Sequence, residues 1–206
     1  MTNKTYITLA VEDMLSERVT RALIVQSKLN FEVANVLMRG GNGYLRRIIH
    51  GLNDSAKGWT YFLLTDLDRA QCPSDIISKW LDGQPVHPNL IFRIAVREVD
   101  SWLFADKKAF ADFLGVNCAR IPNDVDQIVD PKRLLIDISK HSRKGKIRRN
   151  LVPADGSTAE VGSGYNDILG DFVEKHWNAY RASKNSNSLK RALLKLDAYS
   201  FVHEDN

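Results

Sequence analysis

Hydrophobic residues in the first hundred positions follow two different spacings. Residues 5–11, TYITLAV, are a short run of β-branched and apolar side chains, which is typical of a buried strand. From residue 13 to about residue 29 the apolar positions instead recur at helical spacing, with Leu15, Val19 and Leu23 on one face. This change of period predicts a strand followed by a helix.

The strand and helix unit then repeats. Further strands are predicted at 32–38, 59–65 and 89–96, and helices at 45–52 and 73–81. Parallel neighbouring strands need crossover connections of about a dozen residues or more, which helices usually supply. The alternation therefore predicts an α/β fold with a mostly parallel sheet that is flanked by helices.

After residue 96 the strand pattern fades. Residues 97–115 are predicted to form one or two short helices, and the Gly-rich segment 142–165 is predicted to be an irregular loop. We expect an α/β region over 1–105 and a helical region over 106–206, packed together as one compact unit. The remaining amphipathic segments are 130–141, 165–177 and 188–199.

Composition sets broad limits on function. With 206 residues and 44% hydrophobic content the chain can bury a core, and its net charge of +4 favours acidic partners only mildly. Cys72 and Cys118 are far apart and form no CxxC pair, so neither a disulfide framework nor a thiolate zinc site is indicated. There is no membrane-spanning apolar stretch and no signal-peptide core, so a cytoplasmic location is expected.

Acidic residues follow three of the four predicted strands. Glu12 follows the first strand, Asp66 and Asp68 follow the third, and Glu98 and Asp100 follow the fourth. The carboxyl ends of parallel strands lie at one edge of a sheet, where ligands commonly bind. Carboxylates crowded there would have raised pKa values or would need a cation, and Mg²⁺ or Mn²⁺ suits such oxygen ligands.

Helix capping is the alternative explanation for single acids. Asp and Ser are favoured at helix N-caps, and acids in a first turn complement the helix dipole. Asp13, Asp68 and the pair Ser74 and Asp75 could therefore be ordinary helix-starting residues. For the set formed by Glu12, Asp66 and Asp68 we favour the functional interpretation.

A basic segment is a candidate surface for nucleic acid. Residues 140–149 are rich in Lys and Arg and contain no acid, so they could contact a phosphate backbone. A solvated helix or loop face is the common alternative for such a run. The side chains that we expect to contact nucleic acid are Lys144, Lys146, Arg148 and Arg149.

The acidic motifs resemble those of a known fold. The acid after the first strand in AVEDMLSE and the Asp-x-Asp pair in LLTDLD resemble the Toprim fold of topoisomerases, primases and overcoming-lysogenization-defect nucleases. More of the chain resembles a Toprim-related bacterial family associated with mobile elements and with partner ATPases in phage defence. Asp13 stands where Toprim proteins usually have Gly. The wider resemblance covers residues 11–17, 66–73, 96–106, 150–166 and 188–196.

The resemblance implies a nuclease. It assigns Glu12 as the acid/base, Asp66 and Asp68 as ligands of Mg²⁺ or Mn²⁺, and Glu98 with Asp100 as further acids of the site. The implied activity is phosphodiester hydrolysis of nucleic acid with water as nucleophile, with an ATPase as a further partner. The sequence leaves open whether the chain forms a homo-oligomer.

Two other functions stay open at this point. A doubly wound phosphatase or phosphotransferase would also have acids at strand ends, but it would normally use an Asp nucleophile at the position of Glu12. A non-catalytic regulatory or interaction module with a degenerate Toprim site is the second alternative, and Asp13 in place of Gly is consistent with it.

Overall fold

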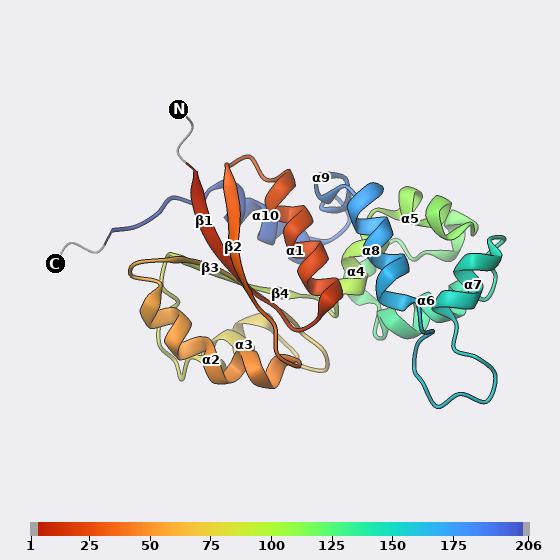
Figure 1. The fold of residues 1–206 in the computed structure, drawn as a ribbon, viewed down its shortest axis with the longest axis horizontal. Coiled ribbons are helices and arrows are strands. Elements are labelled where there is room, and N and C mark those ends of the chain that lie inside the picture. The colour runs from red at the N-terminus through yellow and green to blue at the C-terminus, as the bar shows by residue number, and fades with distance from the viewer. Residues whose placement is uncertain (1–3, 204–206) are drawn as a thin grey trace.

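The computed structural model describes residues 4–203, and it contains one four-stranded sheet in which all strands are parallel (Figure 1). The strand order is β2-β1-β3-β4, so β1 and β3 are the central strands. This confirms the predicted α/β class. The strands are β1 (Thr5–Ala10), β2 (Phe31–Leu37), β3 (Thr60–Asp66) and β4 (Leu90–Ala95).

Helices cover both faces of the sheet. α1 lies on one face, and α2 and α3 lie on the other (Figure 1). Two buried apolar clusters match this division, because successive side chains of a strand point to opposite faces: Leu64 of β3 packs with α1, whereas Leu63 packs with α2. These helices are α1 (Met14–Gln26), α2 (Asn42–Ser55) and α3 (Pro73–Trp80).

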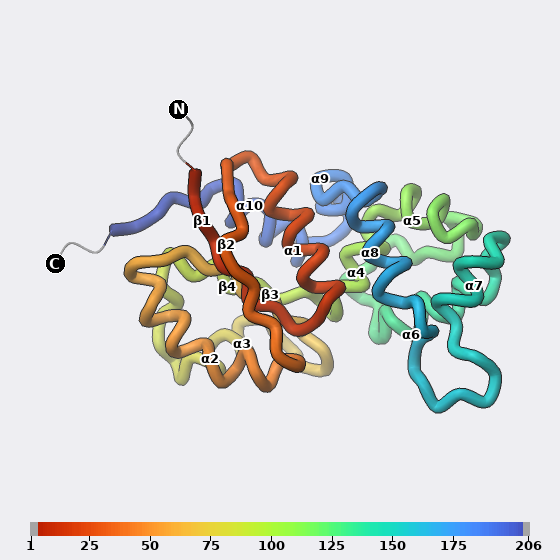
Figure 2. The backbone as a smooth tube through the Cα atoms, in the orientation of Figure 1, coloured from red at the N-terminus to blue at the C-terminus, as the bar shows by residue number. Residues whose placement is uncertain are grey.

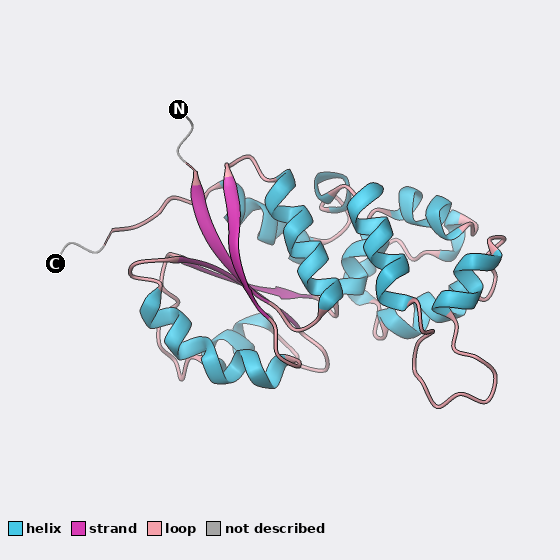
Figure 3. Ribbon diagram, viewed as in Figure 1, coloured by secondary structure: helices cyan, strands magenta, loops and turns pink. Residues whose placement is uncertain are grey.

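The C-terminal half is helical, as predicted (Figure 3). No helix in the described part of the chain is long and apolar enough to cross a membrane. The elements of this half are α4 (Val99–Ala105), α5 (Lys107–Leu114), α6 (Pro131–Ser139), α7 (Gly145–Leu151), α8 (Tyr165–Lys175), α9 (Ala179–Ala182) and α10 (Asn187–Asp197), with short 3₁₀ turns at Cys118–Arg120 and Val125–Gln127.

The prediction of an irregular loop over 142–165 was wrong for its first part, which is helix α7. Ile147 and Leu151 are four residues apart and are both buried, so tertiary packing of one helix face outweighs the Gly and the charges around them. The loop that follows is closed at its neck, where Gly162 N–H donates to the Leu151 carbonyl at 2.9 Å. A Cβ at Gly162 would lie 2.3 Å from a backbone oxygen, so this position requires glycine.

The two halves of the chain share one core. The larger apolar cluster includes Ile7 of β1, Trp102 of α4 and Leu196 of α10. Near the C-terminus the chain returns to the sheet, and α10 packs beside β4 (Figure 2). There the hydroxyl groups of Tyr199 and Thr60 lie 2.7 Å apart in a buried hydrogen bond.

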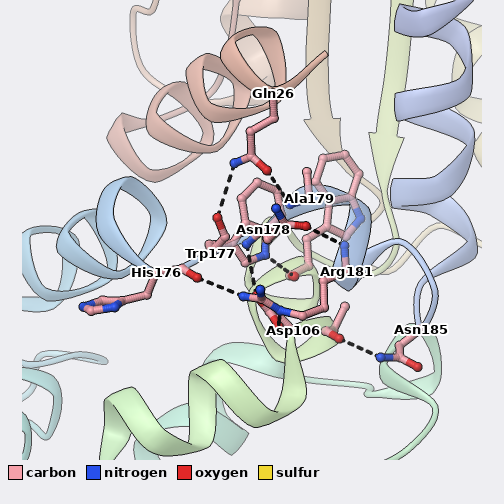
Figure 4. Close-up of polar contacts among 10 residues, drawn as sticks. Gln26, Asp106, His176, Trp177, Asn178, Ala179, Arg181 and Asn185 are labelled. Atoms are coloured by element: carbon pink, nitrogen blue, oxygen red, sulfur yellow. Dashed lines mark hydrogen bonds and ion pairs between the residues drawn. The ribbon is translucent and has the colours of Figure 1, made fainter. Parts of the chain in front are cut away.

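A polar network ties α1 to the junction of α4 and α5 (Figure 4). The buried carboxylate of Asp106 accepts hydrogen bonds from the Arg181 guanidinium and from the Asn178 N–H. The Gln26 side chain bridges to the same segment by accepting from Ala179 N–H at 2.8 Å. Asp106 is therefore a structural acid, and the network fixes α9 against the helices that follow β4.

The strand order places a topological switch point between β1 and β3. From β1 the chain moves outward to β2, whereas from β3 it moves outward in the opposite direction to β4. In an open parallel sheet the loops separate at such a topological switch point, and ligands bind beside the carboxyl ends of the two strands.

Candidate functional site

Glu12 and Asp66 lie together at this switch point. Glu12 follows β1, and Asp66 is the last residue of the neighbouring strand β3. One carboxylate oxygen of Glu12 accepts a hydrogen bond from the Thr65 hydroxyl and another from the Asp66 N–H at 3.0 Å. The structure thus brings together two of the acids that the sequence placed at separate strand ends.

Asp66 also contacts the next element. Its Oδ1 accepts a hydrogen bond of 2.9 Å from the N–H of Val99, in the first turn of α4. Asp66 therefore satisfies one of the N–H groups that a helix start leaves without an intrahelical partner. No described residue donates to the second oxygen of Asp66 or of Glu12, so each acid is fixed through one oxygen only.

Asp68 lies on a tightly held loop. Its φ is +50°, in the left-handed region that Asp tolerates better than most residues. The Arg97 guanidinium donates to the carbonyl groups of Asp68 and of Ala70 at 3.3 and 2.8 Å, and the Asn42 side chain donates to the Asp68 carboxylate at 3.4 Å. Asp68 is exposed, so the loop presents this carboxylate to solvent beside the partly buried Glu12 and Asp66.

Glu98 stands at the N-cap position of α4 but makes no capping bond. Its Oε2 is buried and has no hydrogen-bond partner among the described residues, and the nearest cation is the Lys132 ammonium at 3.9 Å. Buried polar atoms normally have a partner, and leaving one without costs about 1–3 kcal/mol. This oxygen is therefore a candidate ligand atom.

Asp100 differs from the other acids because it has an internal partner. Its carboxylate is buried and accepts a hydrogen bond from the Tyr165 hydroxyl. The two residues line a pocket of about 210 Å³ together with Asp13, Lys132 and Asn166. This bond gives Asp100 a structural role at the pocket wall.

Burial controls the electrostatics of these acids. It raises the pKa of Glu12 and raises that of Asp66 well above its usual value, with the charge of Glu12 as the next cause for Asp66. Burial also raises the pKa of Asp100, and it raises the pKa of Glu98 to about 7. Raised pKa values of this kind are common at functional sites.

Lys132 is the cation of this cluster. Burial disfavours its charged form, but the negative charges of Asp100 and Glu98 outweigh burial and raise the pKa of the Lys132 ammonium. The lysine stays charged and offsets part of the negative charge. Glu12, Asp66, Glu98 and Asp100 therefore form an acidic cluster, and Lys132 balances its negative charge only in part.

The capping alternative is right for Asp13 and does not apply to Asp68. Asp13 is the N-cap of α1, and its Oδ1 accepts from the Ser16 N–H at 2.8 Å. The N-cap of α3 is Cys72, so Asp68 does not start that helix.

The donor atoms fit a hard divalent cation in chemical type. Glu12, Asp66, Asp68 and Glu98 offer only carboxylate oxygens, which Mg²⁺ and Mn²⁺ prefer. The partnerless buried oxygen of Glu98 fits the same interpretation. Within residues 4–203 no three His, Cys, Asp or Glu side chains form a ready-made ligand group. Mg²⁺ commonly uses one or two carboxylates together with water and substrate phosphate, so such a group is not required.

The predicted nucleic-acid contacts lie on and beside α7, where two of the four have structural partners. The Lys144 ammonium donates to the carbonyls of Asp112 and Phe113 at 2.9 Å, at the end of α5, and Arg148 donates to a backbone carbonyl. All four side chains are exposed. Nucleic-acid contact by this segment stays a prediction.

Sequence reasoning missed three residues that shape the site. Arg97 fixes the Asp68 loop, Lys132 balances the acids, and Tyr165 bonds to Asp100. Arg97 and Tyr165 lie inside segments that carry the Toprim resemblance, and that resemblance was the feature of the sequence that could have pointed to them. Nothing in the spacing of α6 set Lys132 apart from other surface lysines.

Comparison with protein-family models, with curated proteins and with solved structures found no match for this chain. Its chemistry is therefore inferred from its own side chains. The central feature is the meeting of Glu12 and Asp66 at the switch point, with Asp68 two residues beyond.

Proposed function

We propose that this protein hydrolyses phosphodiester bonds of nucleic acid with the help of Mg²⁺ or Mn²⁺. The observation that carries the proposal is the contact between Glu12 and the end of β3. A Glu after the first strand and an Asp-x-Asp pair after a later strand form the Toprim pattern. Their proximity supports the resemblance of this α/β fold to Toprim nucleases.

The proposed roles follow from exposure and hydrogen bonding. Asp66 and Asp68 hold the cation, with Glu98 as a further oxygen donor. A bound Mg²⁺ or Mn²⁺ would neutralise phosphate charge and lower the pKa of a water molecule. Glu12, whose raised pKa eases proton uptake, exchanges a proton with the reacting groups. Thr65 positions Glu12 by donating to its carboxylate.

Metal binding can be tested without knowing the substrate. We expect Mn²⁺ or Mg²⁺ to raise the melting temperature of the wild type and to have little effect on Asp66→Asn/Asp68→Asn. A matched control, Asp124→Asn/Asp155→Asn, removes two exposed acids elsewhere and should respond like the wild type. Equal responses from all three proteins would refute the assignment of the ligands.

Catalysis is tested by incubating the purified protein with DNA and with RNA in Mn²⁺, beside Glu12→Gln. We expect cleavage by the wild type and a loss of about 100-fold or more in the variant. Equal cleavage by both proteins would exclude Glu12 as the acid/base. Metal binding without cleavage of any substrate would favour the regulatory module, and the assay should then be repeated with the proposed ATPase partner.

A further inference from the structure

A second pocket lies outside the acidic cluster. It has a volume of about 400 Å³ and opens between α3 and α10, beside β4 at the edge of the sheet. One part of its wall is apolar and consists of Ile77, Phe92, Ile94 and Val96. Such a wall suits a flat apolar group.

Two arginines give the same pocket positive charge. Arg93 is partly buried, and its guanidinium is held by the carbonyls of Phe92 at 2.7 Å and of Arg191 at 3.4 Å. Arg191 itself also lines the pocket. Neither arginine forms an ion pair with an acid of the described chain. Burial and the neighbouring charge of Arg191 lower the pKa of Arg93, so an anion bound here would relieve an unfavourable charge.

The single acid of the pocket has other partners. Asp126 accepts hydrogen bonds from the Ser186 hydroxyl and from the N–H groups of Asn187 and Ser188, at the start of α10. The Asp126 carboxylate thus caps the N-terminus of α10. Asp126 therefore forms no ion pair with either arginine, and the exposed guanidinium of Arg191 remains available for an external anion.

The pocket adjoins the proposed catalytic site. Val96 precedes Glu98 by two residues, so their Cα atoms are at most about 7 Å apart. On the other side, Pro73 and Ser74 line the pocket directly after the loop that carries Asp68. The pocket therefore lies beside the chain segments that carry Glu98 and Asp68.

We propose that this pocket binds one unpaired nucleotide of the nucleic-acid strand that the acidic site cleaves. The base lies against the apolar wall, and its phosphate contacts Arg93 and Arg191. A base inside a duplex is stacked and paired, so only a single-stranded segment can place a base here. This inference rests on the proposed function and adds a preference for single strands.

The test measures binding apart from cleavage. A fluorescein-labelled oligothymidylate is titrated with the full chain in EDTA, which prevents metal-dependent cleavage, and binding is followed by fluorescence anisotropy. We expect Arg93→Gln/Arg191→Gln to bind at least about tenfold more weakly. The slope of log affinity against log salt concentration should fall by about 0.7, because the contacts to one phosphate are lost. Arg191→Glu, at an exposed position, should fold normally and also lose binding.

The matched control is Lys190→Gln/Lys195→Gln, which removes two charges from α10 outside the pocket and should weaken binding by less than about threefold. Unchanged binding by Arg191→Glu would overturn the proposal. So would equal affinity for the duplex form of the same sequence, or tighter binding of adenosine monophosphate or of an acidic peptide than of the oligonucleotide.

These outcomes separate the two proposals. If the arginine variants lose oligonucleotide binding but the wild type cleaves nothing, the pocket stands and the proposed activity fails. If the wild type cleaves nucleic acid and the arginine variants bind and cleave normally, the activity stands and the pocket fails.

Discussion

Replacing Glu98 by Gln should stabilise the protein at alkaline pH and have little effect at acid pH. The folded structure raises the pKa of Glu98 from 4.5 to about 7, chiefly through burial. A raised pKa means that the folded state binds the proton more tightly than the unfolded state does. The stability that this proton supplies is complete below pH 4.5 and is lost as the pH rises through 7. Gln has the size of the protonated acid and carries no charge at any pH.

The size of the effect follows from the two pKa values. One pKa unit corresponds to about 1.4 kcal/mol, so the difference between 4.5 and about 7 corresponds to about 3 kcal/mol of unfolding free energy at pH 8. The Glu98 side chain is 19% exposed, so screening by solvent reduces this figure only modestly. At pH 5.5 the same calculation predicts that Glu98→Gln raises the unfolding free energy by about 1 kcal/mol.

Urea denaturation of the wild type and Glu98→Gln at pH 4, 5.5 and 8, without divalent ions, measures this difference. Asp155→Asn, which neutralises an exposed acid in the loop after α7, is the control and should show no comparable gain at pH 8. A gain for Glu98→Gln that is equally large at pH 4 and pH 8 would refute the electrostatic reasoning. Such a result would mean that Gln improves packing instead.

Three further changes test single contacts. Tyr165→Phe removes the hydroxyl that donates to buried Asp100 and should lower the unfolding free energy by about 2 kcal/mol in urea denaturation. Arg97→Ala releases the loop of Asp68, so it should reduce the Mn²⁺-induced rise in melting temperature while costing only about 1 kcal/mol of stability. Gly162→Ala places a Cβ 2.3 Å from a backbone oxygen and should destabilise by about 2 kcal/mol, and an unchanged melting temperature would contradict this.

The fold was largely predictable because the sheet is buried on both faces. Each strand is then a short apolar run, as in residues 5–11, and each crossover helix has an amphipathic stripe of its own. Helix α7 could not be predicted in this way. Only Ile147 and Leu151 mark its buried face, and two apolar positions among charges give too weak a period.

The acids at the strand ends could be predicted from the sequence, but the residues that contact them could not. Any acid that follows a parallel strand lies at the same edge, so Glu12 and Asp66 could be placed from the sequence. The strand order that makes β1 and β3 neighbours is a tertiary property, and no local pattern encodes it. The bond between Tyr165 and Asp100 joins residues that are 65 positions apart, beyond the reach of any spacing rule.

The charge balance of the site links stability to function. Burial disfavours the ionised forms of Glu12 and Asp66, so at neutral pH the folded chain is less stable than it would be with neutral side chains there. Lys132 offsets only part of this charge. A divalent cation would supply the rest, and its binding would appear as added stability. Arg93 and Arg191 form the opposite arrangement, in which burial and the charge of Arg191 lower the pKa of Arg93. Under the two proposals, a phosphodiester strand together with a divalent cation would offset both charges at once, which neither a free cation nor a free anion could do.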